Sequence, residues 1–367
     1  MNNWTVSYIG LGSNMGSREQ YLNQALELMG DCDGIDVLRT SDFIQSSALA
    51  DMDQPDYINA VVQIRTSLTP ENLLECLLNI EDSLGRVRTH KWGPRVIDLD
   101  LLLYGEHIIH TDTLTVPHEH MHLRSFVLTP LAQLAGDLIH PVMGVSIAEL
   151  QQRLSKCSFA LHEDQVQLVS IAGNIGIGKT TLARQLIENM GGSLIAEPYD
   201  SNPFMPEVYE GRNEYALDSQ LHFLVNRAKQ LDKGMLSSGQ LYFSDYLFDK
   251  ELVYANLLLD KRQLCLYQSI YQRFAENVAL PVLLIYLDDS AENCLERIHL
   301  RNRSYEQDIQ RRFLDGLRIS YNTLINNWSI SPVIKLDTRE FDCLNINDIN
   351  TLVRQIEEYV HIPLTMT

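Results

Sequence analysis

Two aspartates lie two residues apart in a segment that otherwise has the character of a buried β-strand. The segment is VIDLDLLLYG, residues 96–105, and the two acids are Asp98 and Asp100. Because side chains alternate along a strand, both carboxylates point to one face, with Cβ atoms about 6.6 Å apart. Their repulsion at an effective dielectric constant of about 20 is roughly 2 to 3 kcal/mol. A solvated strand face would tolerate the pair, whereas a divalent cation shared with phosphate oxygens would use it.

A glycine-rich loop forms a second candidate site. Residues 173–180, GNIGIGKT, have the G-x-x-x-x-G-K-T form of a P-loop, between the strand-like VQLVSIA and a segment with helical spacing. In such a loop, backbone amides and the helix N-terminus surround phosphates, Lys179 reaches the outer phosphates, and Thr180 can ligate Mg²⁺. Glu197 ends the next predicted strand, SLIAEP, at the edge of the sheet where ligands bind. The sequence therefore predicts two phosphate-handling sites.

The composition restricts the classes of function. The chain has 367 residues, enough for about two domains, and a net charge of −19, which disfavours a nucleic-acid-binding surface. An anionic ligand must therefore be held by local cations, metal ions or backbone amides. The apolar runs are too short for a membrane span. Six scattered cysteines without a CxxC pair, and an N-terminus without a signal-peptide pattern, predict a cytoplasmic protein with reduced thiols.

The pattern of predicted elements divides the chain in two. In the first part, strands are expected in TVSYIGLGSN, YINAVVQIRT and VIDLDLLLYG, and helices in REQYLNQALELM, SLTPENLLECLLNIEDSLG and FVLTPLAQLAG. Residues 155–166 lack a clear period. After them, strand-like and helical segments alternate, which predicts a parallel sheet flanked by helices on both faces. We therefore expect an α/β chain with domains at residues 1–158 and 165–367.

The residues around Asp98 also carry a family resemblance. Arg86, Arg88, Lys91 and Arg95 form a cationic cluster suited to polyphosphate. The segment KWGPRVIDLDLL, residues 91–102, resembles the signature of the 6-hydroxymethyl-7,8-dihydropterin pyrophosphokinases of folate biosynthesis. Further motifs of that family occur in order, and the resemblance extends over roughly residues 4–155. These motifs are GLGSN at 10–14, DQPDYINA at 53–60, GRVR at 85–88 and LTVPHEHMHLRSF at 114–126.

This resemblance implies an α+β, ferredoxin-like domain that transfers pyrophosphate from ATP to the pterin hydroxymethyl group and releases AMP. It implies that Asp98 and Asp100 bind two Mg²⁺ ions that bridge ATP. The ATP and transfer site is expected to contain Glu81, Arg86, Trp92, Arg95, His118 and Arg124, and the pterin site Gly12, Ser13, Asn14, Tyr57, Asn59 and Phe126. Trp92 as a packed aromatic and His118 as a turn histidine are the structural alternatives. Glu119 departs from the family, in which an aromatic residue often follows the Pro-His pair.

The second half resembles the deoxynucleoside kinase family over about residues 166–340. The resemblance rests on the P-loop, on Glu197-Pro198-Tyr199, on SQLHFLVNRAKQ at 219–230 and on the lid-like ERIHLRNRSYEQD at 296–308. It implies that Glu197 takes the proton from the 5′-hydroxyl of a deoxynucleoside. The other implied contacts are Tyr209 and Glu306 to the 3′-hydroxyl, Gln220 and Arg227 to the nucleoside, and Arg297, Arg301 and Arg303 to the transferred phosphate. Those expected at ATP are Gly173, Asn174, Gly176, Gly178, Lys179, Thr180 and Thr181.

One segment departs from the kinase family. Most members carry an acidic residue, an arginine and a serine after the third strand, whereas this chain has FSDYLF, with Ser244 in place of the acid and Asp245 in place of the arginine. Asp245 either takes over ligation of a single Mg²⁺ with Thr180 or marks a weakened site. The aromatic residues Phe223, Phe248 and Tyr254 are expected beside the nucleoside base.

The sequence supports two functional hypotheses. In the first, the chain is a bifunctional ATP-dependent transferase that acts in folate biosynthesis and in deoxynucleoside salvage. In the second, an active pterin pyrophosphokinase is fused to a domain that binds nucleotides or nucleosides without turnover. The FSDYLF segment favours the second hypothesis, whereas Glu197, Lys179 and the lid arginines favour the first. The kinase resemblance also suggests a homodimer. The preferred deoxynucleoside and any coupling between the sites stay open.

Overall fold

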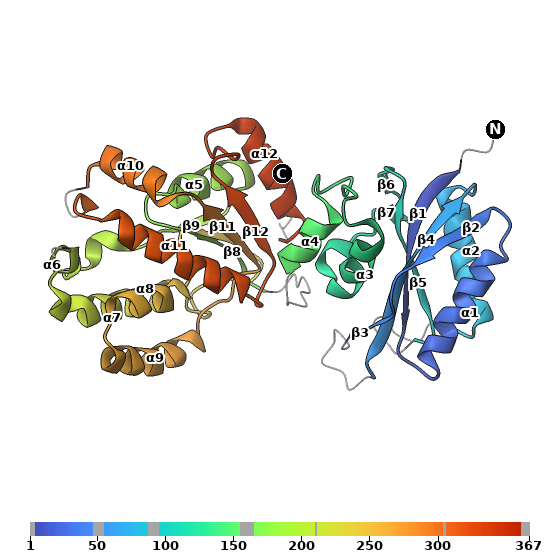
Figure 1. Cartoon of the computed structure of the whole chain (residues 1–367), viewed down its shortest axis with the longest axis horizontal. Coiled ribbons are helices and arrows are strands. Elements are labelled where there is room, and N and C mark those ends of the chain that lie inside the picture. Colours follow the sequence, from blue (N-terminus) through green and yellow to red (C-terminus); the bar gives the residue numbers. More distant parts are fainter. Residues whose placement is uncertain are drawn as a thin grey trace. The chain divides into compact units, whose positions relative to one another are not determined.

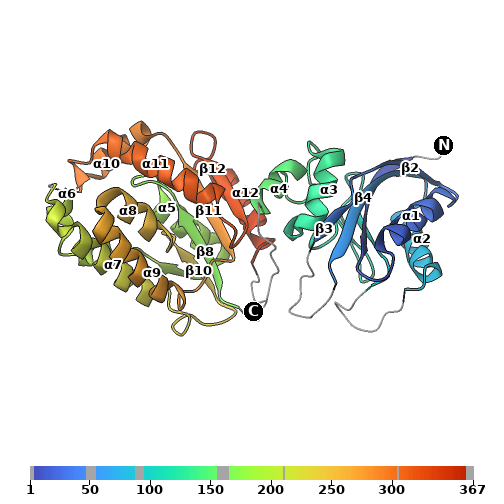
Figure 2. The same ribbon diagram turned by 60° about the horizontal axis from the view of Figure 1, so that its bottom comes forward.

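The protein is described by a computed structural model that covers residues 4–46, 55–86, 95–154, 165–209, 211–303 and 306–360. Its backbone contacts divide the chain into two compact units, Met1–Ala160 and Leu161–Thr367. Figure 1 colours the two units along the sequence, and Figure 2 shows them after a 60° rotation. No helix of the described residues is long and apolar enough to cross a membrane.

The N-terminal unit is built on an antiparallel sheet with the strand order β2-β4-β1-β5, in which β3 also pairs with β4. Its order along the chain, β-α-β-β-α-β with the short β3 added, is that of the predicted ferredoxin-like fold. The main strands are β1 (Thr5–Ser13), β2 (Ile35–Thr40), β3 (Ile44–Ser46), β4 (Tyr57–Thr66) and β5 (Asp98–Tyr104). The helices are α1 (Arg18–Gly30), α2 (Pro70–Ser83), α3 (Ser125–Ala135) and α4 (Ile147–Leu154).

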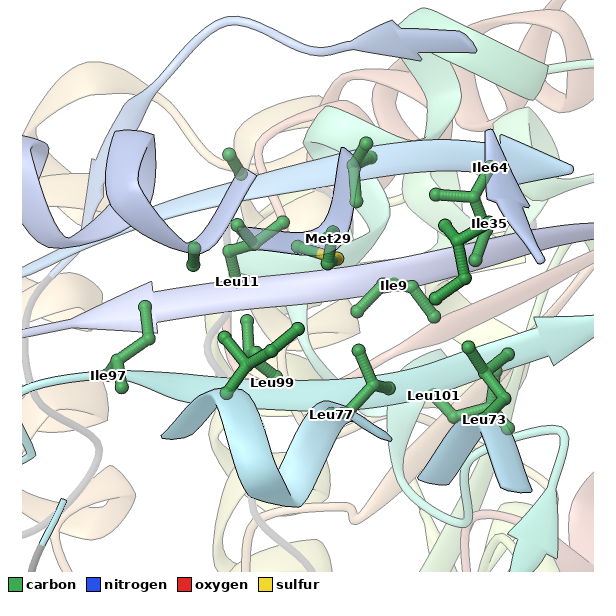
Figure 3. Packing of buried hydrophobic residues seen from close by; sticks show 14 of the residues in the cluster. Ile9, Leu11, Met29, Ile35, Ile64, Leu73, Leu77, Ile97, Leu99 and Leu101 are labelled. Atoms are coloured by element: carbon green, nitrogen blue, oxygen red, sulfur yellow. The ribbon is translucent and has the colours of Figure 1, made fainter. Parts of the chain in front are cut away.

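The core of this unit lies between one face of the sheet and helices α1 and α2. Figure 3 shows Ile9 and Leu11 of β1 beside Leu99 and Leu101 of β5, with Leu77 of α2 packed against them. Helix α2 lies within the predicted segment and starts at Pro70, because Thr69 accepts a hydrogen bond from the Asn72 amide and Pro70 occupies the first turn. Since alternate residues of β5 enter this core, Asp98 and Asp100 point to the opposite face, as predicted.

The C-terminal unit contains the predicted parallel sheet, with the order β12-β11-β8-β10-β9. Helices flank the sheet (Figures 1 and 2). The strands are β8 (Gln167–Ala172), β9 (Ser193–Ile195), β10 (Leu241–Ser244), β11 (Leu283–Asp288) and β12 (Val333–Asp337). The main helices are α5 (Lys179–Met190), α6 (Met205–Tyr209), α7 (Ala216–Gln230), α8 (Lys250–Leu258), α9 (Lys261–Ala275), α10 (Ala291–Arg301), α11 (Arg311–Asn326) and α12 (Ile346–Glu357).

The parallel arrangement collects functional groups at one edge of the sheet. The carboxyl end of β8 leads into the P-loop, that of β9 into Glu197 and that of β10 into Asp245. Gly176 lets the P-loop approach helix α10. Its φ is +75°, and a Cβ there would lie 2.6 Å from the carbonyl oxygen of Cys294. The loop therefore depends on glycine for both its conformation and its packing.

Candidate active sites

Three neighbouring strands form the floor of the N-terminal site. In the sheet, Gly12 of β1 lies opposite Asn59 of β4 on one side and Asp98 of β5 on the other, and Gly10 lies opposite Asp100. A Cβ at Gly12 would be 3.2 Å from Oδ1 of Asn59. Glycines on the central strand therefore leave the face above the two aspartates open to a ligand.

Two arginines neutralise Asp98. Arg86 forms an ion pair of 2.7 Å with Oδ1 of Asp98, and Arg95 contacts Oδ2. Glu81 of α2 is 1% exposed, and its Oε1 forms an ion pair with Arg86. The same oxygen accepts a 2.7 Å hydrogen bond from the Leu99 amide. Glu81 thus fixes an arginine and a strand of the site, in addition to any contact with ATP.

Asp100 faces weaker partners. Its Oδ2 lies 3.8 Å from Nε2 of His118 and 3.6 Å from Nη1 of Arg124. Burial and the nearby Asp98 carboxylate raise the pKa of Asp100 to about 6 against the opposing effect of the arginines. Burial, assisted by Arg124, lowers the pKa of His118 to about 4, so this histidine is neutral at pH 7.

The donor set of this face fits Mg²⁺. Carboxylate oxygens are the ligands that Mg²⁺ prefers, and it usually takes one or two of them together with phosphate oxygens and water. A cation would offset both causes of the raised pKa of Asp100, which are burial and repulsion from Asp98. Among the residues that the structure describes, no group of three or more His, Cys, Asp or Glu could hold a metal ion alone.

The predicted pterin residues surround the same end of the sheet. Asn14 accepts a 2.7 Å hydrogen bond from the Arg95 amide, and Asn59 donates one of 2.8 Å to Ser46. Ser13 is buried, and its hydroxyl has no hydrogen-bond partner among the described residues. The Phe126 ring lies 5.9 Å from the Arg124 guanidinium.

Three further predictions concern residues at the margins of this site. Burial raises the pKa of Tyr57, which Arg95 and Asp98 also influence, so Tyr57 lies within electrostatic reach of both. Glu119, where the family often has an aromatic residue, has a side chain that is 71% exposed. Trp92 lies outside the described residues, as do Arg88 and Lys91.

In the C-terminal unit, the P-loop is closed around its own lysine. Nζ of Lys179 donates to the carbonyl oxygens of Gly173 at 3.0 Å and Asn174 at 2.7 Å. The Asn174 side chain donates to the Leu314 carbonyl at 2.9 Å and so attaches the loop to α11. Gly178, with φ +105°, directly precedes α5, and Thr181 is exposed in the first turn of that helix. These contacts leave the helix N-terminus available to phosphates.

Asp245, rather than Ser244, faces the P-loop. The Thr180 hydroxyl donates a 2.5 Å hydrogen bond to Oδ2 of Asp245, and the Glu197 amide donates one of 2.7 Å to Oδ1. Ser244 is fully buried; its hydroxyl donates to the Tyr246 carbonyl oxygen and also forms a hydrogen bond with the Ser170 hydroxyl. The oxygen atoms of Thr180 and Asp245 are hard ligands that suit one Mg²⁺ beside the P-loop.

Glu197 is the centre of a buried ionic cluster. Arg227 and Lys250 both contact its Oε1, with the Lys250 ammonium at 2.5 Å. Arg227 also pairs with Glu251, which accepts a hydrogen bond from the Tyr267 hydroxyl. Burial alone would raise the pKa of Glu197, but the attraction of Lys250 and Arg227 prevails and lowers it to about 2. Glu197 is therefore ionised at neutral pH.

A cavity of about 290 Å³ adjoins this cluster. Its lining includes Glu197, Tyr199, Gln220, Phe223, Arg227 and Tyr254. Gln220 is buried, and its Oε1 accepts no hydrogen bond from the described residues, so it offers an acceptor to a ligand. The prediction that Phe248 flanks the base is wrong, because this ring lies in the core and stacks on Tyr271 at 5.3 Å.

The predicted lid residues divide into two groups. Arg301 and Arg303 both pair with Glu306, and the Arg303 guanidinium lies 5.6 Å from the ring of Tyr199 at the cavity. Arg297 instead pairs with Asp289 at 2.7 Å, next to the end of β11. The Tyr209 side chain lies outside the described part of the chain.

Lys250, Glu251 and Tyr267 are residues of this site that the sequence did not predict. Lys250 and Glu251 begin α8 in the segment FDKELVYA, where they and Asp249 are three consecutive charged residues among apolar ones. That composition was the available signal, but charged residues in the first turn of a helix are usually solvated.

The fold and the two sites define a pair of phosphate-handling domains, the second of the P-loop kinase type. The model of the family described as "7,8-dihydro-6-hydroxymethylpterin-pyrophosphokinase (HPPK)" matches residues 8–136, and that described as "Deoxynucleoside kinase" matches residues 169–361. The chain thus belongs to the pterin pyrophosphokinase family through its N-terminal unit and to the deoxynucleoside kinase family through its C-terminal unit.

Individual relatives follow the same division. The chain is 46% identical over 136 residues to a 2-amino-4-hydroxy-6-hydroxymethyldihydropteridine pyrophosphokinase of Haemophilus influenzae. The aligned region covers 37% of this chain and 85% of that protein. It is 43% identical over 146 residues to the enzyme of the same name from Synechocystis, covering 40% and 74%. A structure of deoxyadenosine kinase from M. mycoides with bound dATP is 23% identical, with a TM-score of 0.46, and covers 52% of this chain and 99% of that one.

Proposed function

We propose that the chain is a bifunctional ATP-dependent transferase. Its N-terminal site transfers pyrophosphate from ATP to 6-hydroxymethyl-7,8-dihydropterin. The observation that supports this activity is the arrangement of Asp98 and Asp100 on one open strand face, with Arg86 and Arg95 on the first and Arg124 on the second. These groups suit a polyanion that arrives with its metal ions.

In the N-terminal reaction, a bond forms between the pterin hydroxymethyl oxygen and the β-phosphorus of ATP, and the bond from that phosphorus to the oxygen of AMP breaks. The hydroxyl proton is released to solvent. Asp98 and Asp100 would hold two Mg²⁺ ions, which when bound neutralise the phosphate oxygens. Arg86, fixed by Glu81, and Arg95 orient the chain of phosphates. Tyr57, Asn59 and Phe126 hold the pterin, and AMP leaves with the displaced oxygen.

The C-terminal site is proposed to phosphorylate the 5′-hydroxyl of a deoxynucleoside. The supporting observation is an ionised, buried Glu197 at the wall of a cavity that adjoins the P-loop. Glu197 accepts the hydroxyl proton, Gln220 binds the base, and Glu306 binds the 3′-hydroxyl. Lys179 and the lid arginines Arg301 and Arg303 contact the phosphates, and Thr180 and Asp245 would hold one Mg²⁺.

The second hypothesis, a C-terminal domain that binds without turnover, has one observation in its favour. The FSDYLF segment lacks the usual arginine after the acid. Against it stands the hydrogen bond between Thr180 and Asp245, which supplies the oxygen pair of a magnesium site. We therefore favour catalysis at both sites.

The full chain allows each site to serve as the control for the other. With Mg·ATP, the pterin reaction releases AMP, whereas deoxynucleoside phosphorylation releases ADP. We expect Asp98→Ala to abolish AMP formation and retain ADP formation, and Glu197→Gln to have the reverse effect. Each of the four common deoxynucleosides is tested separately, which identifies the preferred base.

The result also separates the two hypotheses. Binding of a deoxynucleoside by calorimetry, without ADP formation in the wild-type chain, would favour a regulatory C-terminal domain. Loss of both products in Asp98→Ala would instead indicate misfolding.

We further propose a cytoplasmic homodimer formed through the kinase unit. Light scattering of the purified chain tests the dimer, and a mass of one 41.9 kDa chain would contradict it.

A further inference from the structure

We propose that Lys250 is a further catalytic residue of the C-terminal site. In the chain without substrates its ammonium group holds the Glu197 carboxylate, and with substrates bound it also contacts the 5′-oxygen and the phosphoryl group that this oxygen receives. This inference rests on the proposed kinase function and adds a residue to it.

The position of Lys250 places a positive charge between the carboxylate of Glu197 and the cavity. Lys250 is the first residue of α8, is 2% exposed and lines the same cavity as Glu197. Its Nζ lies 2.5 Å from Oε1 of Glu197, 5.7 Å from the Tyr199 ring and 5.0 Å from the Tyr254 ring. Both rings line the cavity, so the ammonium is at the point where a hydroxyl group must approach Glu197.

The segment that precedes α8 explains why the cation comes from Lys250. Because Asp245 faces the P-loop, it takes the place of the acid in the family motif, and the next residue, Tyr246, takes the place of the arginine. Tyr246 is fully buried, and its hydroxyl donates to Gln230 at 2.8 Å. Tyr246 therefore supplies no positive charge near Glu197, and Lys250, five residues after Asp245, does.

Arg227 is the other cation on Glu197, but its surroundings hold it in place. One end of its guanidinium contacts Glu197 and the other contacts Glu251, which is itself fixed by Tyr267. Lys250 has a flexible side chain with three N–H donors, and among the described residues Glu197 is its one carboxylate partner. Lys250 can thus turn toward a substrate oxygen, whereas Arg227 would have to leave a buried carboxylate.

The charge state of Lys250 can change in the working range of the enzyme. Burial lowers its pKa to about 8, Glu197 opposes this change, and the positive charges of Arg227 and Lys179 add to it. The neighbouring Tyr199 is neutral at these pH values, because burial and Glu197 raise its pKa well above 10. The ammonium is therefore present below about pH 8, and an anionic phosphate nearby would extend that range upward.

The chemical step balances without a proton from Lys250. The 5′-oxygen forms a bond to the γ-phosphorus, the bond from that phosphorus to the β-phosphate oxygen breaks, and ADP leaves. The proton of the 5′-hydroxyl passes to Glu197. Lys250 stays charged and stabilises the negative charge on the 5′-oxygen and the transferred group.

The experiment compares Lys250→Met, Lys250→Arg and the control Lys261→Met, which changes an exposed lysine of α9. Deoxynucleoside phosphorylation by the full chain is followed from pH 6 to 10 with the nucleoside that wild type prefers. We expect kcat of Lys250→Met to fall about 100-fold, as on removal of a transition-state donor, with KM within about 3-fold. Lys250→Arg should recover at least about one tenth of kcat, and its alkaline decline should move up by more than about one pH unit, since a guanidinium stays charged.

The controls separate failure of this inference from failure of the proposed function. AMP formation at the N-terminal site reports on the amount of each variant chain, and the calorimetric transition of the C-terminal unit shows that this unit is folded. If wild type phosphorylates a deoxynucleoside and Lys250→Met keeps kcat within about 2-fold, Lys250 is not catalytic and the kinase function stands. The same conclusion holds if Lys250→Arg retains the wild-type alkaline decline, a comparison that applies even if Lys250→Met does not fold. If wild type phosphorylates none of the deoxynucleosides, the proposed function fails and this inference fails with it.

Discussion

The Thr180 hydroxyl donates a 2.5 Å hydrogen bond to Oδ2 of Asp245, which connects the first turn of α5 to the end of β10. The other oxygen of Asp245 accepts the amide of Glu197. The Asp245 carboxylate thus connects helix α5, the end of strand β10 and the backbone of Glu197. This geometry makes Asp245 the acid of the FSDYLF segment that faces the P-loop.

Replacing Asp245 with Asn tests this relationship. Asparagine has nearly the same shape but lacks the negative charge with which a carboxylate attracts Mg²⁺. We expect kcat for deoxynucleoside phosphorylation to fall by at least about 10-fold and the Mg²⁺ concentration for half-maximal rate to rise. Both quantities are obtained from a titration of ADP formation with Mg²⁺.

Ser244→Ala is the matched control for this prediction. The Ser244 hydroxyl bonds to Ser170 and to the Tyr246 carbonyl within the sheet, away from the phosphates. Its loss should leave the Mg²⁺ requirement unchanged. A raised requirement in Ser244→Ala together with a normal one in Asp245→Asn would show that the metal is held at Ser244.

The sequence predicted the elements whose periodicity is strong. Strand β4 has the bounds expected from YINAVVQIRT, and α2 lies within the expected segment SLTPENLLECLLNIEDSLG. Strands β2 and β3 were missed, because β2 exposes Val37 and Leu38 on an edge of the sheet and β3 has three residues. A pattern so short or so exposed lacks the alternation from which a strand is predicted.

Groups of residues that are close in the sequence were easier to predict than groups that come together only in the fold. The P-loop and the pair Asp98 and Asp100 each lie within a short segment, so residue types and spacing were sufficient to predict that these side chains lie together. The cluster around Glu197 combines residues of α7, α8 and α9 that are far apart in the sequence. Sequence pattern alone does not tell that Lys250 is buried while Phe248 turns away from the cavity, because both depend on how α8 packs.

The Tyr267 hydroxyl supports the buried charges from outside the cavity. It donates to Oε2 of Glu251, and both residues are fully buried. Tyr267→Phe removes this donor and leaves a buried carboxylate oxygen without it, which costs about 1 to 3 kcal/mol. We expect the calorimetric transition of the C-terminal unit, identified by its shift with a bound deoxynucleoside, to move to lower temperature by the corresponding amount.

Tyr242→Phe provides the comparison for this prediction. Its hydroxyl makes exposed hydrogen bonds, donating to the Gln240 side chain at 3.1 Å and accepting from the Ser237 amide. Water replaces such bonds, so the change should be within about 0.5 kcal/mol. Equal effects of the two substitutions would show that burial of Glu251 is not the cause.

His140 makes the stability of the N-terminal unit dependent on pH. It is buried, and its Nδ1 accepts hydrogen bonds from the amides of Val142 at 3.3 Å and Met143 at 3.2 Å. Burial, followed by the influence of His122, lowers the pKa of His140 to about 3. A depressed pKa contributes stability that is complete above the unfolded value of about 6.5 and is lost as the pH falls toward 3.

Between pH 7 and pH 5 this residue should lower the free energy of unfolding by about 2 kcal/mol. His140→Asn keeps an oxygen acceptor for the two amides but does not titrate. In urea unfolding at both pH values, the loss on acidification should therefore be smaller by that amount in the variant. An identical pH dependence in wild type and variant would assign the acid sensitivity to other groups.

Glu81 allows a test of how the N-terminal site is supported. Its Oε1 holds both Arg86 and the Leu99 amide, and Arg86 in turn contacts Asp98. Glu81→Gln keeps an acceptor for the amide but removes the charge that orients Arg86, so we expect kcat/KM for AMP formation to fall about 10- to 100-fold. Glu75→Gln, at an exposed position of the same helix α2, should leave it unchanged. Urea unfolding of the same chains reports on the folding of the N-terminal unit, and deoxynucleoside phosphorylation reports on the amount of chain. Normal AMP formation in Glu81→Gln would mean that Asp98 and the substrate hold Arg86 without help from α2.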